Sequence, residues 1–163
     1  MQQNEYKECR RLLSPAAGQV FPMRELRLNG ESERMSGEGF AVAAAGGIRG
    51  MLFRAAPAVE ICAPADGAVT AVFEDSSGFR LRTGDGLTLV VELPEPAEFY
   101  ISTGDLAAAG EPVCRVSQEG FRRGSAGAMV RFEDPERITE FHVTSGVKRS
   151  GKPAAQYSIR EPE

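Results

Sequence analysis

Hydrophobic residues in this chain lie in short runs, and each run is bounded by glycine, proline or charged residues. Short apolar runs with turn-forming ends are typical of β-strands. The pattern therefore predicts an all-β domain built from short strands. The clearest expected strands are Ala71–Glu74, Phe79–Thr83, Leu87–Leu93, Pro112–Ser117 and Tyr157–Arg160.

Two turn-and-strand units occur twice in the same order. PAAGQV at 15–20 returns as PADGAV at 64–69, and GEGFAV at 37–42 returns as GDGLTL at 84–89. In the first unit proline and glycine form a turn and the β-branched valine enters a strand. In the second unit the paired glycines supply the backbone of a tight hairpin. The echo predicts a single-domain β-sandwich or barrel with an approximate twofold internal repeat.

Only one segment favours a helix. Asp134 can cap it and Pro135 suits its first turn, so we predict one short helix over Asp134–Phe141. We expect the domain to cover residues 12–160, with a flexible leader at 1–11 and a tail at 161–163.

Composition narrows the class of protein. Eighteen glycines and ten prolines suit strands and turns better than a helical bundle. The net charge of −4 argues against a nucleic-acid reader, because no dense basic stripe is present. The polar N-terminus does not resemble a secretory signal, and the longest apolar stretch is too short to span a membrane. We therefore expect a cytoplasmic protein without membrane insertion. Cys62 and Cys114 are expected to be buried, inert thiols.

In this order and spacing the motifs resemble the glucose-type enzyme IIA family of the bacterial sugar phosphotransferase system. The resemblance runs from Ser14 to Ile159. It includes the P-x-x-G-x-V turns, the G-E-G at 37–39, the V-F-E at 72–74 with Phe79, and the turn region at 104–113. It implies a β-sandwich of the duplicated-hybrid-motif kind. A biotinyl or lipoyl carrier is disfavoured, because Lys7, Lys148 and Lys152 do not lie on an apolar hairpin.

The resemblance also implies where chemistry should lie. Family members use two facing histidines, one of which takes the phosphoryl group from the carrier HPr. The matching positions here are Ser77 and Glu92, which keep the family's spacing of 15 residues. We therefore expect no catalytic residue, and a binding site formed by Asp75, Ser76, Ser77, Phe79 and Glu92. Ser77 and Glu92 should lie side by side at a shallow depression flanked by Phe79.

Electrostatics oppose phosphotransfer at this site. Two unit charges about 4 Å apart repel by about 4 kcal/mol at an effective dielectric constant of about 20, and a phosphoryl group is nearly dianionic. Glu92 would therefore repel the incoming phosphate, and Ser77 has no obvious base. The only histidine, His142, lies outside both motif positions and is expected to be a packed or surface residue.

No metal or cofactor site is expected. A zinc site is not expected, because the sequence places no further His or Cys ligands with His142. Glu92, Glu95 and Glu98 are expected to lie in a solvated loop rather than to bind a cation.

Two further segments bear on partner binding. The family's apolar docking loop is replaced by Glu25–Glu31, which should weaken an apolar docking face. An insert at about 46–56 carries Met51, Leu52 and Phe53, which either extend the core or form a partner patch.

Three functions stay open at this point. The first is a pseudoenzyme, an enzyme IIA-like domain that regulates sugar transport by binding a sugar permease, an HPr-like carrier or a regulatory target. The second is an active phosphocarrier that uses Glu92 or Ser77 as acceptor. The third is a domain that binds a small polar ligand in the former phosphate pocket.

Overall fold

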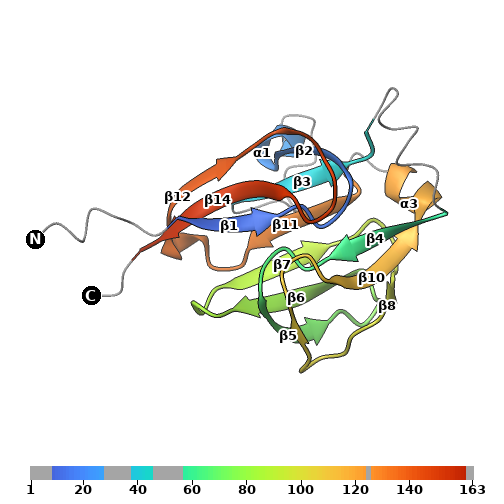
Figure 1. The fold of residues 1–163 in the computed structure, drawn as a ribbon, viewed down its shortest axis with the longest axis horizontal. Helices are drawn as coiled ribbons and strands as arrows, with labels where there is room; N and C mark the ends of the chain where they lie inside the picture. The colour runs from blue at the N-terminus through green and yellow to red at the C-terminus, as the bar shows by residue number, and fades with distance from the viewer. Residues whose placement is uncertain (1–8, 28–37, 46–56, 124–125, 161–163) are drawn as a thin grey trace, which may run out of the picture.

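The structure is a computed structural model and describes residues 9–27, 38–45, 57–123 and 126–160. Its largest element is an open antiparallel sheet of eight strands, which packs with two three-stranded sheets around one core (Figure 1). In sheet order the eight strands are β13 (Gly146–Lys148), β2 (Gly18–Pro22), β3 (Gly39–Ala43), β11 (Ala128–Phe132), β7 (Thr88–Glu92), β6 (Gly78–Thr83), β5 (Gly67–Val72) and β9 (Leu106–Ala107). The all-β sandwich prediction is confirmed, and the described sheets form no closed barrel.

The two smaller sheets have matching architecture. One consists of β1 (Arg10–Leu13), β14 (Pro153–Ile159) and β12 (Ile138–Val143). The other consists of β4 (Ala58–Cys62), β10 (Pro112–Ser117) and β8 (Glu98–Phe99). In each small sheet the central strand pairs with a strand that precedes a P-x-x-G turn. β14 pairs with β1, which precedes the turn at Pro15, and β10 pairs with β4, which precedes the turn at Pro64.

Backbone hydrogen bonds reveal the internal twofold relation. The Leu13 N–H donates to the Pro64 carbonyl at 2.8 Å, and the Cys62 N–H donates to the Pro15 carbonyl at 2.7 Å. Leu13 and Cys62 are 49 residues apart, and so are Pro15 and Pro64. Exchanging the two P-x-x-G units therefore converts each of these hydrogen bonds into the other. The first echo in the sequence therefore marks a true structural correspondence.

Glycine is required at the same place in both units. A Cβ on Gly18 would fall on the Ala43 carbonyl oxygen, and a Cβ on Gly67 would fall on the Arg82 carbonyl oxygen. The neighbouring strand thus approaches the backbone too closely for any side chain at the start of β2 or β5.

The second echo does not mark a structural correspondence. In sheet order, β13, β2, β3 and β11 of one half match β9, β5, β6 and β7 of the other. The counterpart of β3 is therefore β6, and not the strand β7 that follows the G-D-G turn. Shared turn residues made the two G-x-G segments look equivalent, although they occupy different places in the sheet.

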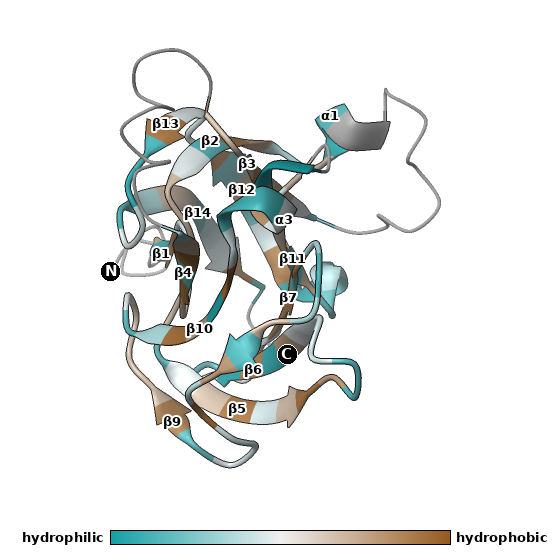
Figure 2. Cartoon of the chain, turned by 90° about the vertical axis from the view of Figure 1, so that its right-hand side faces the viewer, coloured by the Kyte–Doolittle hydropathy of each residue, from teal (hydrophilic) through white to brown (hydrophobic). Residues whose placement is uncertain are grey.

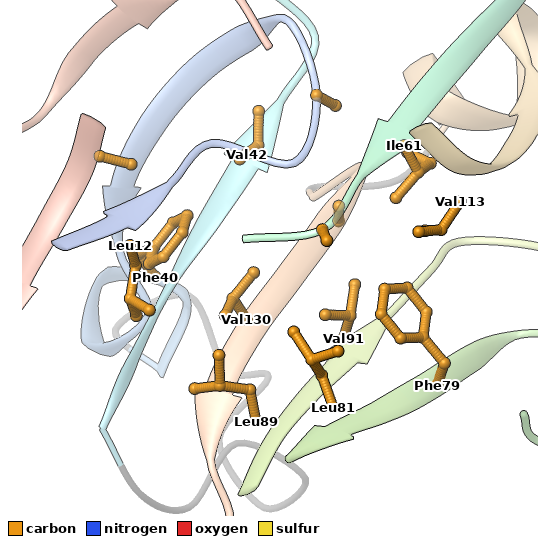
Figure 3. Packing of buried hydrophobic residues seen from close by; sticks show 14 of the residues in the cluster. Leu12, Phe40, Val42, Ile61, Phe79, Leu81, Leu89, Val91, Val113 and Val130 are labelled. Carbon is orange, nitrogen blue, oxygen red and sulfur yellow. The ribbon is translucent and has the colours of Figure 1, made fainter. Parts of the chain in front are cut away.

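The buried core repeats the same relation. Phe40 and Phe79 occupy equivalent positions on β3 and β6, and Val91 and Val130 lie opposite each other on β7 and β11 (Figure 3). All four side chains are fully buried. The centre of the eight-stranded sheet, between β7 and β11, is thus the position of the pseudo-twofold axis.

The helix expected over Asp134–Phe141 is wrong. Pro135–Arg137 forms one 3-10 turn, and Ile138–Val143 continues as strand β12, paired with β14. Pairing with β14 and the β-branched and aromatic residues of this segment overrode the local helix signal. The helices described are α1 (Arg24–Arg27) and α3 (Gln118–Arg123), neither of which the hydrophobic pattern predicted.

The described domain begins earlier than expected. Arg10 and Arg11 belong to β1 and are therefore part of the domain rather than of the predicted leader at 1–11, and residues 1–8 lie outside the described residues. The tail at 161–163 lies outside the described residues. Cys62 and Cys114 are buried free thiols, as predicted, and burial raises the pKa of Cys114 to about 12.

Asp85, in the G-D-G turn between β6 and β7, connects this turn to the neighbouring small sheet. Its carboxylate accepts from the Arg10 guanidinium at 2.8 Å and from the Tyr157 hydroxyl at 3.3 Å. Burial and the Asp85 charge raise the pKa of Tyr157 above its ordinary value. The turn of the large sheet is thereby tied to β1 and β14.

Candidate functional site

Ser77 and Glu92 belong to neighbouring strands. Ser77 directly precedes β6, and Glu92 is the last residue of β7. Gly78 pairs with Glu92 in the antiparallel register, and the Leu93 N–H donates to the Ser77 carbonyl at 2.8 Å. The structure therefore brings the two motif positions together at the ends of adjacent strands.

Glu92 lies in a row of residues that crosses five strands near the pseudo-twofold axis. Backbone register connects Phe21 on β2, Ala41 on β3, Met129 on β11, Glu92 on β7 and Gly78 on β6. We call these five residues the axial row. They alternate with the fully buried core residues, so the row lies on the face of the sheet that points away from the main core. The three residues on β2, β3 and β11 are apolar, and Glu92 on β7 is the charged member of the row.

Arg131 is the partner of Glu92. Its Nε lies 3.2 Å from a Glu92 carboxylate oxygen, and both side chains are about a quarter to a third exposed. Because Val130 and Val91 are opposite each other, Arg131 and Glu92 are counterparts about the pseudo-twofold axis. The sequence analysis missed Arg131, although the alternation of apolar and polar residues in Ala128–Phe132 could have indicated β11.

Ser77 is bound to Asp75. The Asp75 carboxylate accepts from the Ser77 hydroxyl at 2.6 Å and from the Ser77 N–H at 3.0 Å. The hydroxyl hydrogen bond is the main cause that lowers the pKa of Asp75. Ser76, between them, adopts a left-handed backbone with φ 62°, which closes the turn. Asp75 positions Ser77 but is a weaker base than an ordinary carboxylate.

Phe79 does not flank an open depression. Its ring is fully buried in the core and packs edge-on against Phe99, with centroids 6.0 Å apart. Strand alternation places Phe79 on the opposite face of β6 from Gly78 and Arg80. The aromatic residue beside Gly78 and Arg80 is Phe73, whose ring lies 5.2 Å from the Arg80 guanidinium carbon.

Glu92 at the end of β7, Glu95 in the loop that follows and Glu98 on β8 have separate partners. Glu92 pairs with Arg131, Glu98 pairs with Arg115 at 2.7 Å, and Glu95 accepts from Ser117. Across the described residues, no group of three His, Cys, Asp or Glu side chains could hold a metal ion.

Glu95 joins the loop after β7 to helix α3. Its carboxylate accepts from the Ser117 N–H at 3.0 Å and from the Ser117 hydroxyl at 2.9 Å. The same hydroxyl accepts from the Gly120 N–H at 2.9 Å, so Ser117 caps the helix. A Cβ on Gly120 would overlap the Glu95 carboxylate.

The other predicted residues lie elsewhere. His142 is exposed on β12, in one of the small sheets and outside the axial row. Met51, Leu52 and Phe53 of the insert lie outside the described residues, as does most of the expected docking loop. The first part of that loop forms α1.

Comparisons with known proteins agree with this fold. The family described as phosphoenolpyruvate-dependent sugar phosphotransferase system, EIIA 1, matches residues 10–124. Among solved structures, the chain is similar to the glucose permease IIA from Mycoplasma capricolum, with a TM-score of 0.70 and 17% sequence identity. That match covers 91% of this chain and 96% of the other. No curated protein sequence matches. Within the described ranges, no helix is long and apolar enough to cross a membrane.

Proposed function

The chain belongs to the EIIA 1 family of the phosphoenolpyruvate-dependent sugar phosphotransferase system, and from this premise we propose that it no longer carries a phosphoryl group. It acts instead in the cytoplasm by binding a protein partner in sugar transport or its regulation. Asp75, Ser76, Ser77 and Glu92, together with the axial row, form the contact face.

The histidine count carries this proposal. The chain has one histidine, His142, and the resemblance implies a mechanism that needs two facing imidazoles. His142 lies on β12, while Ser77 and Glu92 lie at the ends of β6 and β7. One imidazole in another sheet cannot supply both the phosphoryl acceptor and the phosphate-binding N–H.

The side chains at and around Ser77 and Glu92 are poor substitutes for the two imidazoles as phosphoryl acceptors. A serine nucleophile needs a base that takes its proton, and the pKa of Asp75 is lowered by the hydrogen bond that it accepts from Ser77. The Glu92 carboxylate is engaged by Arg131, which reduces its availability as a nucleophile.

The contact face has chemistry suited to a protein partner. Phe21 and Met129 are partly exposed beside buried Met23 and Ala41, and the Glu92–Arg131 pair adjoins them. An apolar patch rimmed by charged groups is a typical protein interface. An HPr-like carrier or the soluble part of a sugar permease is the partner class that the family suggests.

A second candidate function is carried by Arg131. Its guanidinium offsets the charge that Glu92 would present to an incoming phosphate, so the repulsion is smaller than for an isolated carboxylate. Under this alternative, Glu92 would accept the phosphoryl group as an acyl phosphate and Arg131 would bind its oxygens.

Binding can be measured separately from transfer. We expect isotope-labelled protein, titrated with HPr and with the soluble permease domain of the same organism, to show saturable amide shifts along the axial row for one of them. Arg131→Glu should abolish the shifts, because it places two carboxylates at the axis. Arg149→Glu, an exposed control at the turn after β13, should leave them unchanged. Shifts confined to another face, or no binding to either protein, would refute the proposed contact face.

A further inference from the structure

Strand β9 forms a free edge of the eight-stranded sheet. It is the last strand in the sheet order, beside β5, and the described part of the chain places no strand on its other side (Figure 2). Register pairs Ala68 of β5 with Leu106. The next residue of β5, Val69, donates its N–H to the Asp105 carbonyl at 2.8 Å. Because backbone groups along an antiparallel strand point alternately toward and away from the partner strand, the N–H and C=O of Leu106 point away from β5.

The Leu106 side chain is also open to solvent. It is 79% exposed, more than any other large hydrophobic side chain in the described ranges. It ends a cross-strand row with Ala68 and Arg82, on the face of the sheet that points away from the main core. These three residues line, together with Ala107 and Ala108, an open and mostly apolar hollow of about 700 Å³. An exposed leucine beside an apolar hollow is a surface that a partner can cover.

The opposite edge strand, β13, provides an internal comparison. Val147 on β13 pairs with Gln19 of β2, in the same way that Leu106 pairs with Ala68. Gln19 and Ala68 are 49 residues apart, so Val147 is the counterpart of Leu106 about the pseudo-twofold axis. Val147 is half-buried and is followed by Lys148, and a lysine on an edge strand discourages further strand pairing. β9 has alanine at that position, so its edge lacks this protection.

Carboxylates lie at both ends of β9. Asp105 lies at its start, and Asp66 and Glu111 line the hollow at its end. Each carboxylate accepts one backbone N–H at 2.7 to 2.9 Å, and the donors for Asp105, Glu111 and Asp66 are Ser102, Ala108 and Ala109 respectively. Arg82, which reaches the hollow from β6, offsets one of the three charges. The ends of β9 therefore favour positively charged groups, and its centre favours an apolar group.

We propose that β9 binds an extended segment of a protein partner, with an apolar centre and a basic residue on either side, as an added strand of the sheet. The backbone of the segment bonds to the N–H and C=O of Leu106, which is the source of affinity in strand addition. Its central side chain covers Leu106 and the hollow, and its basic ends face the carboxylates. A second copy of β9 is disfavoured, because its own carboxylates would meet Asp66, Asp105 and Glu111. This inference goes beyond the proposed function and does not depend on it, since β9 lies at the end of the sheet and the axial row at its centre.

Two capped peptides test the site by amide NMR of the full-length protein. The peptides acetyl-KVLVK-amide and acetyl-EVLVE-amide share the apolar centre and differ in the sign of the flanking charges. We expect KVLVK to cause saturable shifts around Leu106 and to slow hydrogen exchange of the Leu106 amide, because this N–H becomes hydrogen-bonded. EVLVE should bind at least about tenfold more weakly, because its carboxylates meet those at the ends of β9.

Substitutions separate the apolar and charged contributions. Leu106→Ala should weaken KVLVK binding about tenfold, the effect of about two buried CH₂ groups. Asp66→Asn combined with Glu111→Gln keeps both acceptors of backbone N–H groups, and the loss of charge should weaken binding about fivefold. Val147→Ala, the matched change on β13, should leave binding unchanged. Urea unfolding checks that each variant is folded.

Sedimentation of the free protein tests the other occupant, a second copy, and we expect a monomer. The proposal is overturned if KVLVK leaves the Leu106 amide unchanged, if both peptides bind equally, or if Leu106→Ala binds KVLVK like the natural chain. It is also overturned if the chain sediments as a dimer that Leu106→Ala dissociates, because a second copy then occupies β9.

Discussion

The contact between Glu95 and Gly120 gives a prediction whose sign depends on the structure. In an ordinary helix, Gly→Ala stabilises by about 1 kcal/mol, because alanine has the higher helix propensity. Here the new Cβ would occupy the position of the Glu95 carboxylate, so Glu95 must move away from Ser117. We therefore expect Gly120→Ala to destabilise the protein.

The expected magnitude follows from the lost contacts. Glu95 accepts two hydrogen bonds from Ser117, and bonds to a charged group contribute about 1.5–3 kcal/mol each when well buried. Because Glu95 is only half-buried, we expect the two bonds together to contribute about 2–3 kcal/mol. After the gain in helix propensity, the net loss in the free energy of unfolding is about 1–2 kcal/mol.

A double-mutant cycle isolates the contact. With Glu95→Ala already present, the obstruction is gone, and Gly120→Ala should stabilise by about 1 kcal/mol. The effect of one substitution should thus change sign, with a coupling energy of about 2–3 kcal/mol. Urea unfolding at unchanged m-value measures all four proteins. If Gly120→Ala stabilises the natural chain, or if the two effects simply add, the loop after β7 does not hold α3 as the structure shows.

Three further predictions concern titration and reactivity. A thiol reagent should label Cys9 rapidly in the native protein, and should reach Cys62 and Cys114 only after denaturant is added, since these two are buried; rapid labelling of a second thiol would contradict their burial. Native stability should fall as pH rises above about 9, by up to about 1.4 kcal/mol per pH unit from Cys114 alone. The reason is that the unfolded thiol ionises near 9.0, while the folded one has a pKa of about 12. Urea unfolding of Cys114→Ala should show a shallower pH dependence of stability, and an unchanged slope would refute this assignment. Ser77→Ala should raise the pKa of Asp75 toward its ordinary value in a carboxylate NMR titration, since the Ser77 hydroxyl is the main cause of its lowering; an unchanged pKa would refute that cause.

The local pattern predicted the fold class and several strands well. Pro112–Ser117 coincides with β10, and Phe79–Thr83 lacks only the first residue of β6. The P-x-x-G-x-V echo located the internal repeat, because a close backbone approach demands glycine at Gly18 and Gly67 alike.

Non-local contacts account for what the sequence analysis missed. The segment after Asp134 has helix-start residues, yet pairing with β14 makes it a strand. Arg131 is 39 residues from Glu92, and their proximity depends on the register between β7 and β11. Glu92, Glu95 and Glu98 looked like one group in the sequence, but they contact Arg131, Ser117 and Arg115 respectively.

The measurement that tests the central claim most directly is phosphoryl transfer from labelled phosphoenolpyruvate through enzyme I and HPr. We expect no label on the natural chain, because Ser77 and Glu92 stand where the resemblance places both histidines. Ser77→His combined with Glu92→His should gain at most weak, acid-labile labelling, since the segment after Arg24 lacks the family's apolar docking residues. The account would be contradicted, and the chain would be an active phosphocarrier, by any one of three results. These are hydroxylamine-sensitive label on Glu92, acid-stable label on Ser77, and label that disappears with His142→Asn.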